Sequence, residues 1–431
     1  MAKRPRRSGS TAVPPPTSAS DAKDEQPASE PPPTQATYAP ALNAGFQGIA
    51  SRVQEMHQAI SGKTFDSLQS VPGLSVPARI VQGVHDAVTQ GVYAAVRHGG
   101  DAALSLAAGA ERLSTDPGRV PGPKEQGLRN ALNAAVGDAL ANSGSALAIQ
   151  MGLYAGTAPL PMTRAALATL RPRVCVFIHG LACDERSWAL HTDAWNDSPW
   201  AHALHGDEPI QYATLLEHEL GVSAIALRYN TGVAIDANAR QLAALLEHAM
   251  RAAPHVREWL LVGHSMGGLV ARRAHEIAFA DGLTWASRAP MIICLGSPHQ
   301  GAPLEQLGHL TSVALEASEV TRPLGRIANA RSQGIKDLRH GLKKKRRAEP
   351  ASPPALRLVF ATLGDESDKV MGPLIGKMFG DGLVTAGSAA DEGAGGDVER
   401  VELAGLGHMG LLNHPRVYVV LRRWLGAPEL T

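Results

Sequence analysis

The spacing of apolar residues predicts helices in the first part of the chain. Over residues 41–170, apolar side chains recur three and four positions apart, the period of a helix with one buried face. One later stretch reads GLRNALNAAVGDALANSGSALAIQMGL, and an earlier stripe steps by four through Ile80, Val84, Val88, Val92 and Val96. We expect an all-helical region over residues 41–170 that packs on the next domain. An amphipathic surface for a membrane, lipid body or partner protein is the alternative.

The pattern differs on either side of this region. Residues 1–40 are dominated by Pro, Ser, Thr and Ala with scattered charge, a composition that buries too little apolar surface to order a chain. We expect a disordered tail, and we favour a solubilising leader over a docking arm. From about residue 171, short apolar runs of strand length alternate with helical stretches.

This alternation predicts the architecture of residues 171–431. Six runs have the length and composition of buried strands: VCVFIHG, VSAIALRY, WLLVGH, MIICLG, LRLVFATLG and VERVELAG. Helical stretches such as IQYATLLEHEL, NARQLAALLEHAM and SMGGLVARRAHEIAFA lie between them, and HPRVYVVLRRWL forms a final helix with Pro415 in its first turn. The alternation indicates an α/β fold with a mostly parallel sheet and helices on both faces.

Composition and charge argue against several classes of protein. Lys and Arg number 41 against 40 Asp and Glu, so the chain lacks the basic excess of most nucleic-acid binders, and we expect no nucleic-acid partner. Three cysteines cannot build a disulfide framework. No apolar run approaches the roughly 20 residues of a membrane span, and a polar, Pro-rich stretch follows the basic start MAKRPRR where a signal peptide would be apolar. We expect a cytoplasmic protein.

The strongest chemical signal is the segment WLLVGHSMGGLVARRA. An apolar strand runs into GHSMG and a helix follows, which is the strand–turn–helix setting of a nucleophile elbow. Glycine stands two residues to either side of Ser265 because larger side chains would collide in so tight a turn. The turn lifts the serine hydroxyl above the sheet edge and points a helix N-terminus at a developing oxyanion. We interpret Ser265 as a nucleophile.

A second motif, FIHGL, ends the first predicted strand. Its His-Gly turn leaves the backbone N–H of Leu181 free to meet the elbow, and the N–H of Met266 would be the second donor of an oxyanion hole. His179 is a candidate for the catalytic base. Because it precedes the oxyanion turn rather than following the nucleophile, we favour a structural role for it.

The base is expected near the C-terminus, in VELAGLGHMGLLNHPRVY. Glycines open a loop around His408 after the last predicted strand, and such a loop can carry an imidazole back over the strand ends to Ser265. His414 is the alternative candidate. Its place directly before Pro415 suits the start or cap of a helix, so we favour His408.

The acid that orients the imidazole should lie between Ser265 and His408 in the chain, after the strand LRLVFATLG. Asp365 and Asp368, in GDESD, follow that strand closely but stand among several charges. Asp381, in GDGLVT, is framed by glycines and followed by an apolar pair that can hold it rigidly. We favour Asp381 and keep the other two as alternatives.

Taken in order, the segments FIHGL, GHSMGG, LGSPHQGAP, GDGLVT and LAGLGHMGLL resemble the α/β-hydrolase superfamily, and within it the lipase and PGAP1-like (GPI inositol-deacylase-like) branch. The resemblance runs from about residue 171 to the end. The two antiparallel strands that usually begin this fold are not evident before VCVFIHG, so we expect a minimal sheet of about six strands.

The resemblance also implies roles for individual residues. It implies a catalytic triad of Ser265, His408 and Asp381, with oxyanion N–H groups from Leu181 and Met266. It further implies that the Gly-Ser-Pro-His segment lines the site beside the elbow. The residues that we assign to the substrate pocket are His179, Gly180, His264, Ser297 and His299.

An insertion at about residues 303–354 separates two predicted strands, and the resemblance implies a lid over the serine. It contains a basic run from Lys343 to Arg347. We favour a solvated loop tip for this run over a contact to an anionic membrane or polyanionic substrate. The 17 histidines show no metal-ligand spacing, and no glycine-rich stretch leads into a helix as a phosphate-binding loop does, so we expect neither metal nor other cofactor.

The motifs together favour a serine ester hydrolase that acts through a covalent acyl-enzyme on carboxylic esters, with acyl lipids suggested by the lipase-like segments. Two alternatives remain open. One is a non-catalytic hydrolase-fold scaffold that binds a partner or a lipid or polyester surface. The other is an acyltransferase with the same triad. The sequence does not indicate an oligomeric state.

Overall fold

The computed structural model describes residues 122–205, 209–302, 332–342, 353–363 and 381–427, with isolated positions between 54 and 90. Several sequence predictions lie outside these residues: the N-terminal tail, the apolar stripe from Ile80 to Val96, Asp365, Asp368, the basic run from Lys343 to Arg347 and most of the insertion. The division of the chain at residue 171 stays a prediction.

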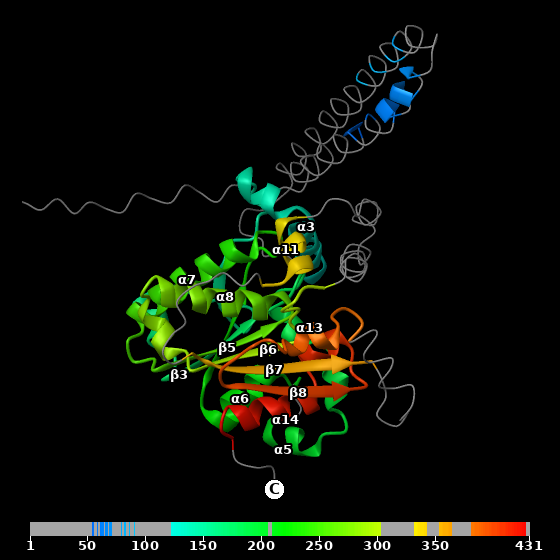
Figure 1. The fold of residues 1–431 in the computed structure, drawn as a ribbon. Coiled ribbons are helices and arrows are strands. Elements are labelled where there is room, and N and C mark those ends of the chain that lie inside the picture. Colours follow the sequence, from blue (N-terminus) through cyan, green and yellow to red (C-terminus); the bar gives the residue numbers. More distant parts are fainter. Residues whose placement is uncertain are drawn as a thin grey trace, which may run out of the picture. The chain divides into compact units, whose positions relative to one another are not determined.

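An eight-stranded sheet forms the centre of the fold, in the order β2-β1-β4-β3-β5-β6-β7-β8 (Figure 1). Its parallel part comprises β3 (Arg173–Ile178), β4 (Ser223–Arg228), β5 (Glu258–His264), β6 (Met291–Leu295), β7 (Ala355–Thr362) and β8 (Val398–Ala404). These are the six strands predicted from the apolar runs. The α/β-hydrolase fold is therefore confirmed.

The expected strand number is wrong, because β1 (Gly152–Ala155) and β2 (Ala158–Pro159) add an antiparallel hairpin beside β4. The predicted helix before them ends early, as α3 (Pro123–Asn142), and Gly144 follows with a left-handed backbone (φ 65°). Beyond it, the Arg129 side chain donates to three carbonyl oxygens of residues 146–148, and the Asn133 side chain accepts from Ile149 N–H. These bonds hold a non-helical path that leads into β1.

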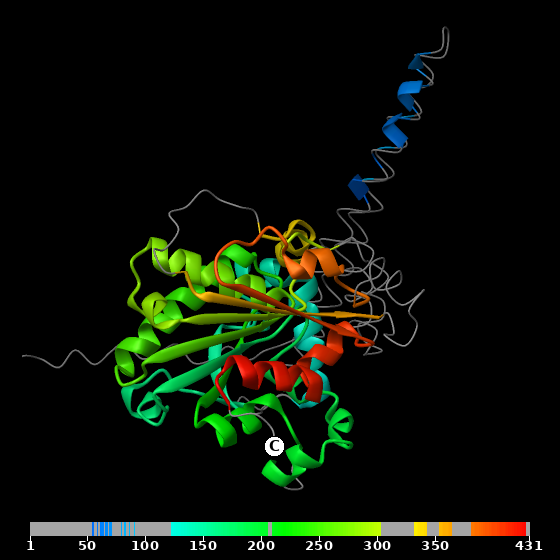
Figure 2. The same ribbon diagram turned by 60° about the horizontal axis from the view of Figure 1, so that its bottom comes forward.

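Helices cover both faces of the sheet (Figures 1 and 2). On one face lie α7 (Ile235–Ala252) and α8 (Met266–Ala280), and on the other lie α5 (Pro199–His205), α6 (Tyr212–Leu220) and α14 (Pro415–Trp424). The shorter elements are α4 (Arg164–Leu167), α11 (Gln333–His340), α13 (Ala386–Ala390) and the 3-10 helices η1 (Glu185–Ala189), η2 (Thr192–Trp195), η3 (Thr284–Arg288) and η4 (His408–Leu412). Within the described ranges, no helix is both long and apolar enough to cross a membrane.

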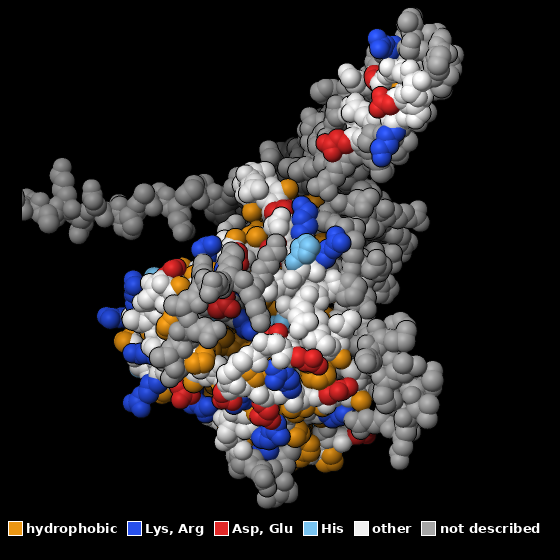
Figure 3. Space-filling view, in the orientation of Figure 1, with side chains coloured by type: hydrophobic (Ala, Val, Ile, Leu, Met, Phe, Trp, Pro, Cys, Tyr) orange, Lys and Arg blue, Asp and Glu red, His pale blue; other side chains and the backbone are white. Residues whose placement is uncertain are grey.

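Alternate residues of each central strand enter different cores. In β3, Val174, Val176 and Ile178 join the cluster under α7 and α8, whereas Cys175 and Phe177 join the cluster under α6 and α14. Burial on both faces explains why these strands are continuous apolar runs. On the described part of the face drawn in Figure 3, Lys and Arg side chains are interspersed with Asp and Glu.

Candidate active site

Ser265 occupies a sharp turn between β5 and α8. Its φ of 53° and ψ of −121° form a backbone conformation that non-glycine residues rarely adopt, at a cost on the order of 1–3 kcal/mol. A Cβ atom on Gly267 would lie 2.1 Å from the Ile178 carbonyl oxygen, and one on Gly263 would lie 2.4 Å from the Gly268 nitrogen. Backbone contacts on both sides of the serine therefore require the two glycines of the motif.

The turn after β3 packs directly against this elbow. A Cβ atom on Gly180 would lie 3.0 Å from both Ser265 Cβ and His264 Nδ1. Leu181 follows in the same turn. Met266 is the first residue of α8, where a backbone N–H has no acceptor within the helix. Both predicted oxyanion donors thus belong to segments that meet at Ser265.

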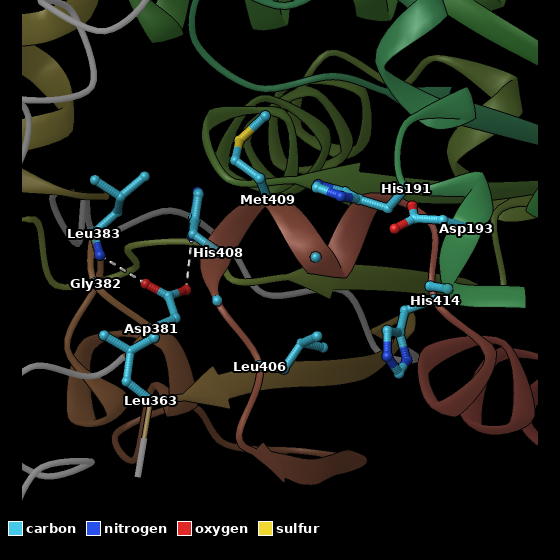
Figure 4. A pocket seen from close by; sticks show the side chains of 13 residues that line it. His191, Asp193, Leu363, Asp381, Gly382, Leu383, Leu406, His408, Met409 and His414 are labelled. Carbon is cyan, nitrogen blue, oxygen red and sulfur yellow. Dashed lines mark hydrogen bonds and ion pairs between the residues drawn. The ribbon is translucent and has the colours of Figure 1, made fainter. Parts of the chain in front are cut away.

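His408 and Asp381 form a buried pair, with His408 Nδ1 2.7 Å from Asp381 Oδ2 (Figure 4). The other carboxylate oxygen accepts hydrogen bonds from the backbone N–H groups of Leu383 (3.0 Å) and Val384 (2.7 Å). Three hydrogen bonds fix the orientation of the carboxylate. The carboxylate accepts the Nδ1 proton of the ring, so the neutral imidazole presents Nε2 as a proton acceptor.

The loop that carries His408 lies over the elbow. Gly296, directly after β6, has a φ of 61°, and a Cβ atom on it would come within 3.2 Å of the His408 ring. The preceding Leu295 carbonyl accepts a hydrogen bond from the Ser265 N–H at 2.8 Å. The His264 Nε2–H donates to the His408 carbonyl oxygen at 3.1 Å. The predicted nucleophile and the predicted base are thus brought to one end of the sheet.

The other two histidines considered for the base have their own partners. His179 Nδ1 lies 2.9 Å from the Gly180 carbonyl oxygen, and the Tyr229 N–H donates to Nε2 at 3.4 Å. Its ring stacks on Tyr229 and burial lowers its pKa. His414 accepts a hydrogen bond from the Arg416 N–H at the start of α14. His179 is thus held in the core by its own hydrogen bonds, and His414 caps α14.

Ser297 and His299 lie on the loop after β6, beside α8. A Cβ atom on Gly268 would come 2.1 Å from Ser297 Oγ, so this hydroxyl packs on the first turn of α8. Arg272 donates from one nitrogen to His299 Nδ1 and to the Asp391 carboxylate, both at 2.8 Å. Burial, and then the charge of Arg272, hold the pKa of His299 well below its ordinary value. Ser297 Oγ and His299 Nε2 are buried without a hydrogen-bond partner among the described residues.

A cavity of about 600 Å³ opens beside the acid and the base (Figure 4). Besides His408 and Asp381, its wall includes the apolar side chains of Leu363, Leu383, Leu406 and Met409 and the polar side chains of His191, Asp193 and His414. The five residues that the sequence assigned to a substrate pocket do not line this cavity. Their part in binding substrate stays a prediction.

Two polar residues of the cavity wall, His191 and Asp193, were not predicted as site residues. They lie at and within the short 3-10 helix η2, where no motif or period marks them. Leu383 could have been suspected, because it follows the predicted acid in GDGLVT. In the described part of the chain, no three His, Cys, Asp or Glu side chains gather as metal ligands would.

Comparison with known protein families finds a match to part of the chain. Residues 234–338 match the PGAP1-like alpha/beta domain. This segment, about a quarter of the chain, contains both the elbow and the Gly-Ser-Pro-His loop. The resemblance to the PGAP1-like branch of the α/β hydrolases is confirmed. Among curated proteins, none matches the chain.

Three solved structures illustrate the similarity. The mature form of a lipase from Bacillus licheniformis is 19% identical, with 60% of this chain and 93% of that chain covered and a TM-score of 0.34. A lipase-esterase related protein from Clostridium acetobutylicum is 11% identical, with 60% and 95% covered and a TM-score of 0.34. A type II thioesterase from the yersiniabactin pathway is 14% identical, with 59% and 92% covered and a TM-score of 0.37. Similarities this weak assign no substrate.

Proposed function

We propose that the protein is a serine ester hydrolase that forms a covalent acyl-enzyme on Ser265. The observation that carries this proposal is the buried His408–Asp381 pair, whose loop lies over the turn that holds Ser265. A scaffold has no need of a non-glycine residue in a strained backbone conformation beside a buried pair of this kind.

The geometry supports the following steps. His408 Nε2 takes the hydroxyl proton of Ser265 while Oγ attacks the ester carbonyl carbon, and Asp381 stabilises the imidazolium that forms. The N–H groups of Leu181 and Met266 stabilise the charge on the former carbonyl oxygen. Collapse of this intermediate breaks the bond to the alcohol, which leaves with the proton from His408. Water then attacks the acyl-enzyme in the same way, releases the carboxylic acid and restores the serine.

The substrate in this proposal is a carboxylic ester with an apolar portion, and acyl lipids are the class we favour. The cavity beside His408 supports it, because leucine and methionine side chains form much of its wall.

The test is hydrolysis of p-nitrophenyl esters of increasing acyl length by the full chain and by Ser265→Ala. We expect the substitution to lower kcat by at least about 10⁴-fold and to leave the unfolding midpoint unchanged, because it removes only the nucleophile. Ser287→Ala is the matched control, since Ser287 is exposed and bonds only the Thr284 carbonyl of its own turn. Undiminished turnover by Ser265→Ala would refute the proposal.

A fluorophosphonate probe separates the alternatives. It should label the wild-type chain and not Ser265→Ala, because only an activated serine reacts. Labelling of Ser265 without ester hydrolysis would favour an acyltransferase that uses an acceptor other than water. A chain that neither hydrolyses esters nor reacts with the probe would be a scaffold.

A further inference from the structure

Hydrogen bonds hold both the main chain and the ring of His408. Its N–H donates to the Asp381 carbonyl oxygen at 3.0 Å, and its ring bonds the Asp381 carboxylate at 2.7 Å. Its own carbonyl oxygen accepts the Nε2–H of His264 at 3.1 Å. Asp381 therefore supplies two of the three contacts, and the third comes from the residue directly before Ser265.

We propose that His264 is a positioning residue that sets the base loop relative to the nucleophile, an inference that rests on the proposed function. His264 is joined to Ser265 by a peptide bond and to His408 by a hydrogen bond. A shift of the loop away from the elbow must therefore break that hydrogen bond. The distance between the reacting atoms of Ser265 and His408 depends on it.

Packing keeps the His264 imidazole in place for this role. The side chain is only 1% exposed, and its ring centre lies 4.6 Å from that of His408. The ring also makes an edge contact with Trp188, at 6.4 Å between ring centres. Gly180 closes the remaining side, because even a Cβ atom there would reach His264 Nδ1 at 3.0 Å. These contacts restrict rotation of the ring away from the carbonyl that it binds.

The protonation state of His264 agrees with the geometry. Burial, followed by the nearby His408, holds the pKa of His264 well below its ordinary value, so the ring is neutral and carries one proton. A carbonyl oxygen only accepts, so that proton is on Nε2. Nδ1 has no hydrogen-bond partner among the described residues. A neutral ring adds no positive charge beside His408, which becomes an imidazolium during the reaction.

Substitution of His264 by glutamine and by asparagine distinguishes the positioning role from a role in packing alone. The amide nitrogen of glutamine can occupy the place of Nε2 and donate to the His408 carbonyl, whereas that of asparagine reaches only the place of Nδ1. We expect His264→Asn to lower kcat by about 10- to 100-fold with KM changed less than about threefold, because misplacing a catalytic group by about 1 Å costs that much. His264→Gln should restore kcat to within about threefold of the wild type. Equal losses in the two variants, or no loss in either, would overturn the proposal.

His275 offers a matched control. It is buried, its Nε2 donates to the Ala286 carbonyl at 3.1 Å, and its ring makes an edge contact with Trp285. Burial lowers its pKa as well. His275→Asn should therefore cost similar stability and leave kcat unchanged. A loss of kcat in His275→Asn as large as in His264→Asn would attribute the effect to stability and reject the positioning role.

A second measurement does not depend on turnover. The His408 Nδ1 proton, bonded to Asp381, should give a strongly deshielded, exchange-protected proton resonance, assigned by its loss in Asp381→Asn. We expect the resonance to persist in His264→Gln and to be lost to solvent exchange in His264→Asn. This pattern in a chain without esterase activity would contradict the proposed function and still support the positioning role. A resonance that is unchanged in His264→Asn would overturn the role even in an active enzyme.

Discussion

The nucleophile and the base–acid pair are held in place in different ways. At the elbow, backbone atoms meet backbone atoms, and the motif glycines leave no space for one further carbon. The base and acid are positioned by side-chain hydrogen bonds, between His408 and Asp381, 27 residues apart, and between His264 and His408, 144 residues apart. Backbone contacts make the elbow intolerant of any added atom, whereas side-chain contacts let the base side be weakened without loss of the fold.

Apart from removal of the nucleophile itself, the largest loss of turnover is expected on the base side. Asp381→Asn should lower kcat by about 10³- to 10⁴-fold with little change in unfolding. The asparagine oxygen would still accept hydrogen bonds from the Leu383 and Val384 N–H groups. Its NH₂ group would therefore face His408 Nδ1 and force the ring proton onto Nε2. A proton on Nε2 blocks proton transfer from Ser265. Steady-state kinetics check this, with Asp397→Asn as the control because Asp397 is an exposed partner of Arg357. A loss no greater than in the control would contradict the role of Asp381.

Substitutions on the elbow side should change the stability of the fold rather than the turnover. Gly267→Ala should lower the free energy of unfolding by at least about 3 kcal/mol, because its methyl group has to displace the end of β3. In Gly127→Ala the new methyl group on α3 meets no atom within 4 Å, and stability should rise by about 0.5–1 kcal/mol. Denaturant unfolding of both variants is the measurement. A Gly267→Ala chain as stable as the wild type would mean that the turn yields more readily than its contacts imply.

The smallest effect concerns pH, which acts on the buried imidazoles of the site and leaves the backbone contacts of the elbow unchanged. Burial is the first cause that holds the pKa values of His264 and His299 well below the ordinary value of about 6.5 that the unfolded chain has. Below that pH the unfolded state binds protons that the folded state does not. Stability should therefore be constant above about pH 6.5 and fall on acidification, by up to about 1.4 kcal/mol per pH unit for each histidine.

The free energy of unfolding, measured between about pH 7.5 and 5.5, tests this dependence. His264→Gln should make the decrease shallower, because it removes one of the histidines whose pKa burial lowers. Ser287→Ala should leave it unchanged, because Ser287 is exposed and carries no titratable group. A slope identical in all three chains would show that His264 does not contribute.

The parallel strands and the elbow could be predicted because their causes are local in the sequence. Because β3 is buried on both faces, its residues form a continuous apolar run. Because the turn is crowded, glycine stands on both sides of Ser265. The hairpin of β1 and β2 was missed for the opposite reason. Its strands are four and two residues long, and β1 owes its place to pairing with β4 and to the Arg228 guanidinium over the Tyr154 ring.

The candidate triad was within reach of the sequence, because chain order and glycine-framed loops singled out Ser265, His408 and Asp381. The surroundings of these residues were not. His191 and Asp193 enter the cavity from a segment without a pattern, and the bond from His264 to the His408 carbonyl joins two residues that no spacing rule connects.

The sequence by itself determined the six parallel strands, the tight turn around the serine and the residue types able to transfer a proton. Each depends on the period of apolar residues or on the space at one backbone position, and both are properties of neighbouring residues. Only the tertiary structure decided how hydrogen bonds position the base, which side chains line the cavity and that the hairpin of β1 and β2 extends the sheet beyond β4. These depend on contacts between residues far apart in the chain, whose free energy appears only once the sheet has brought them together.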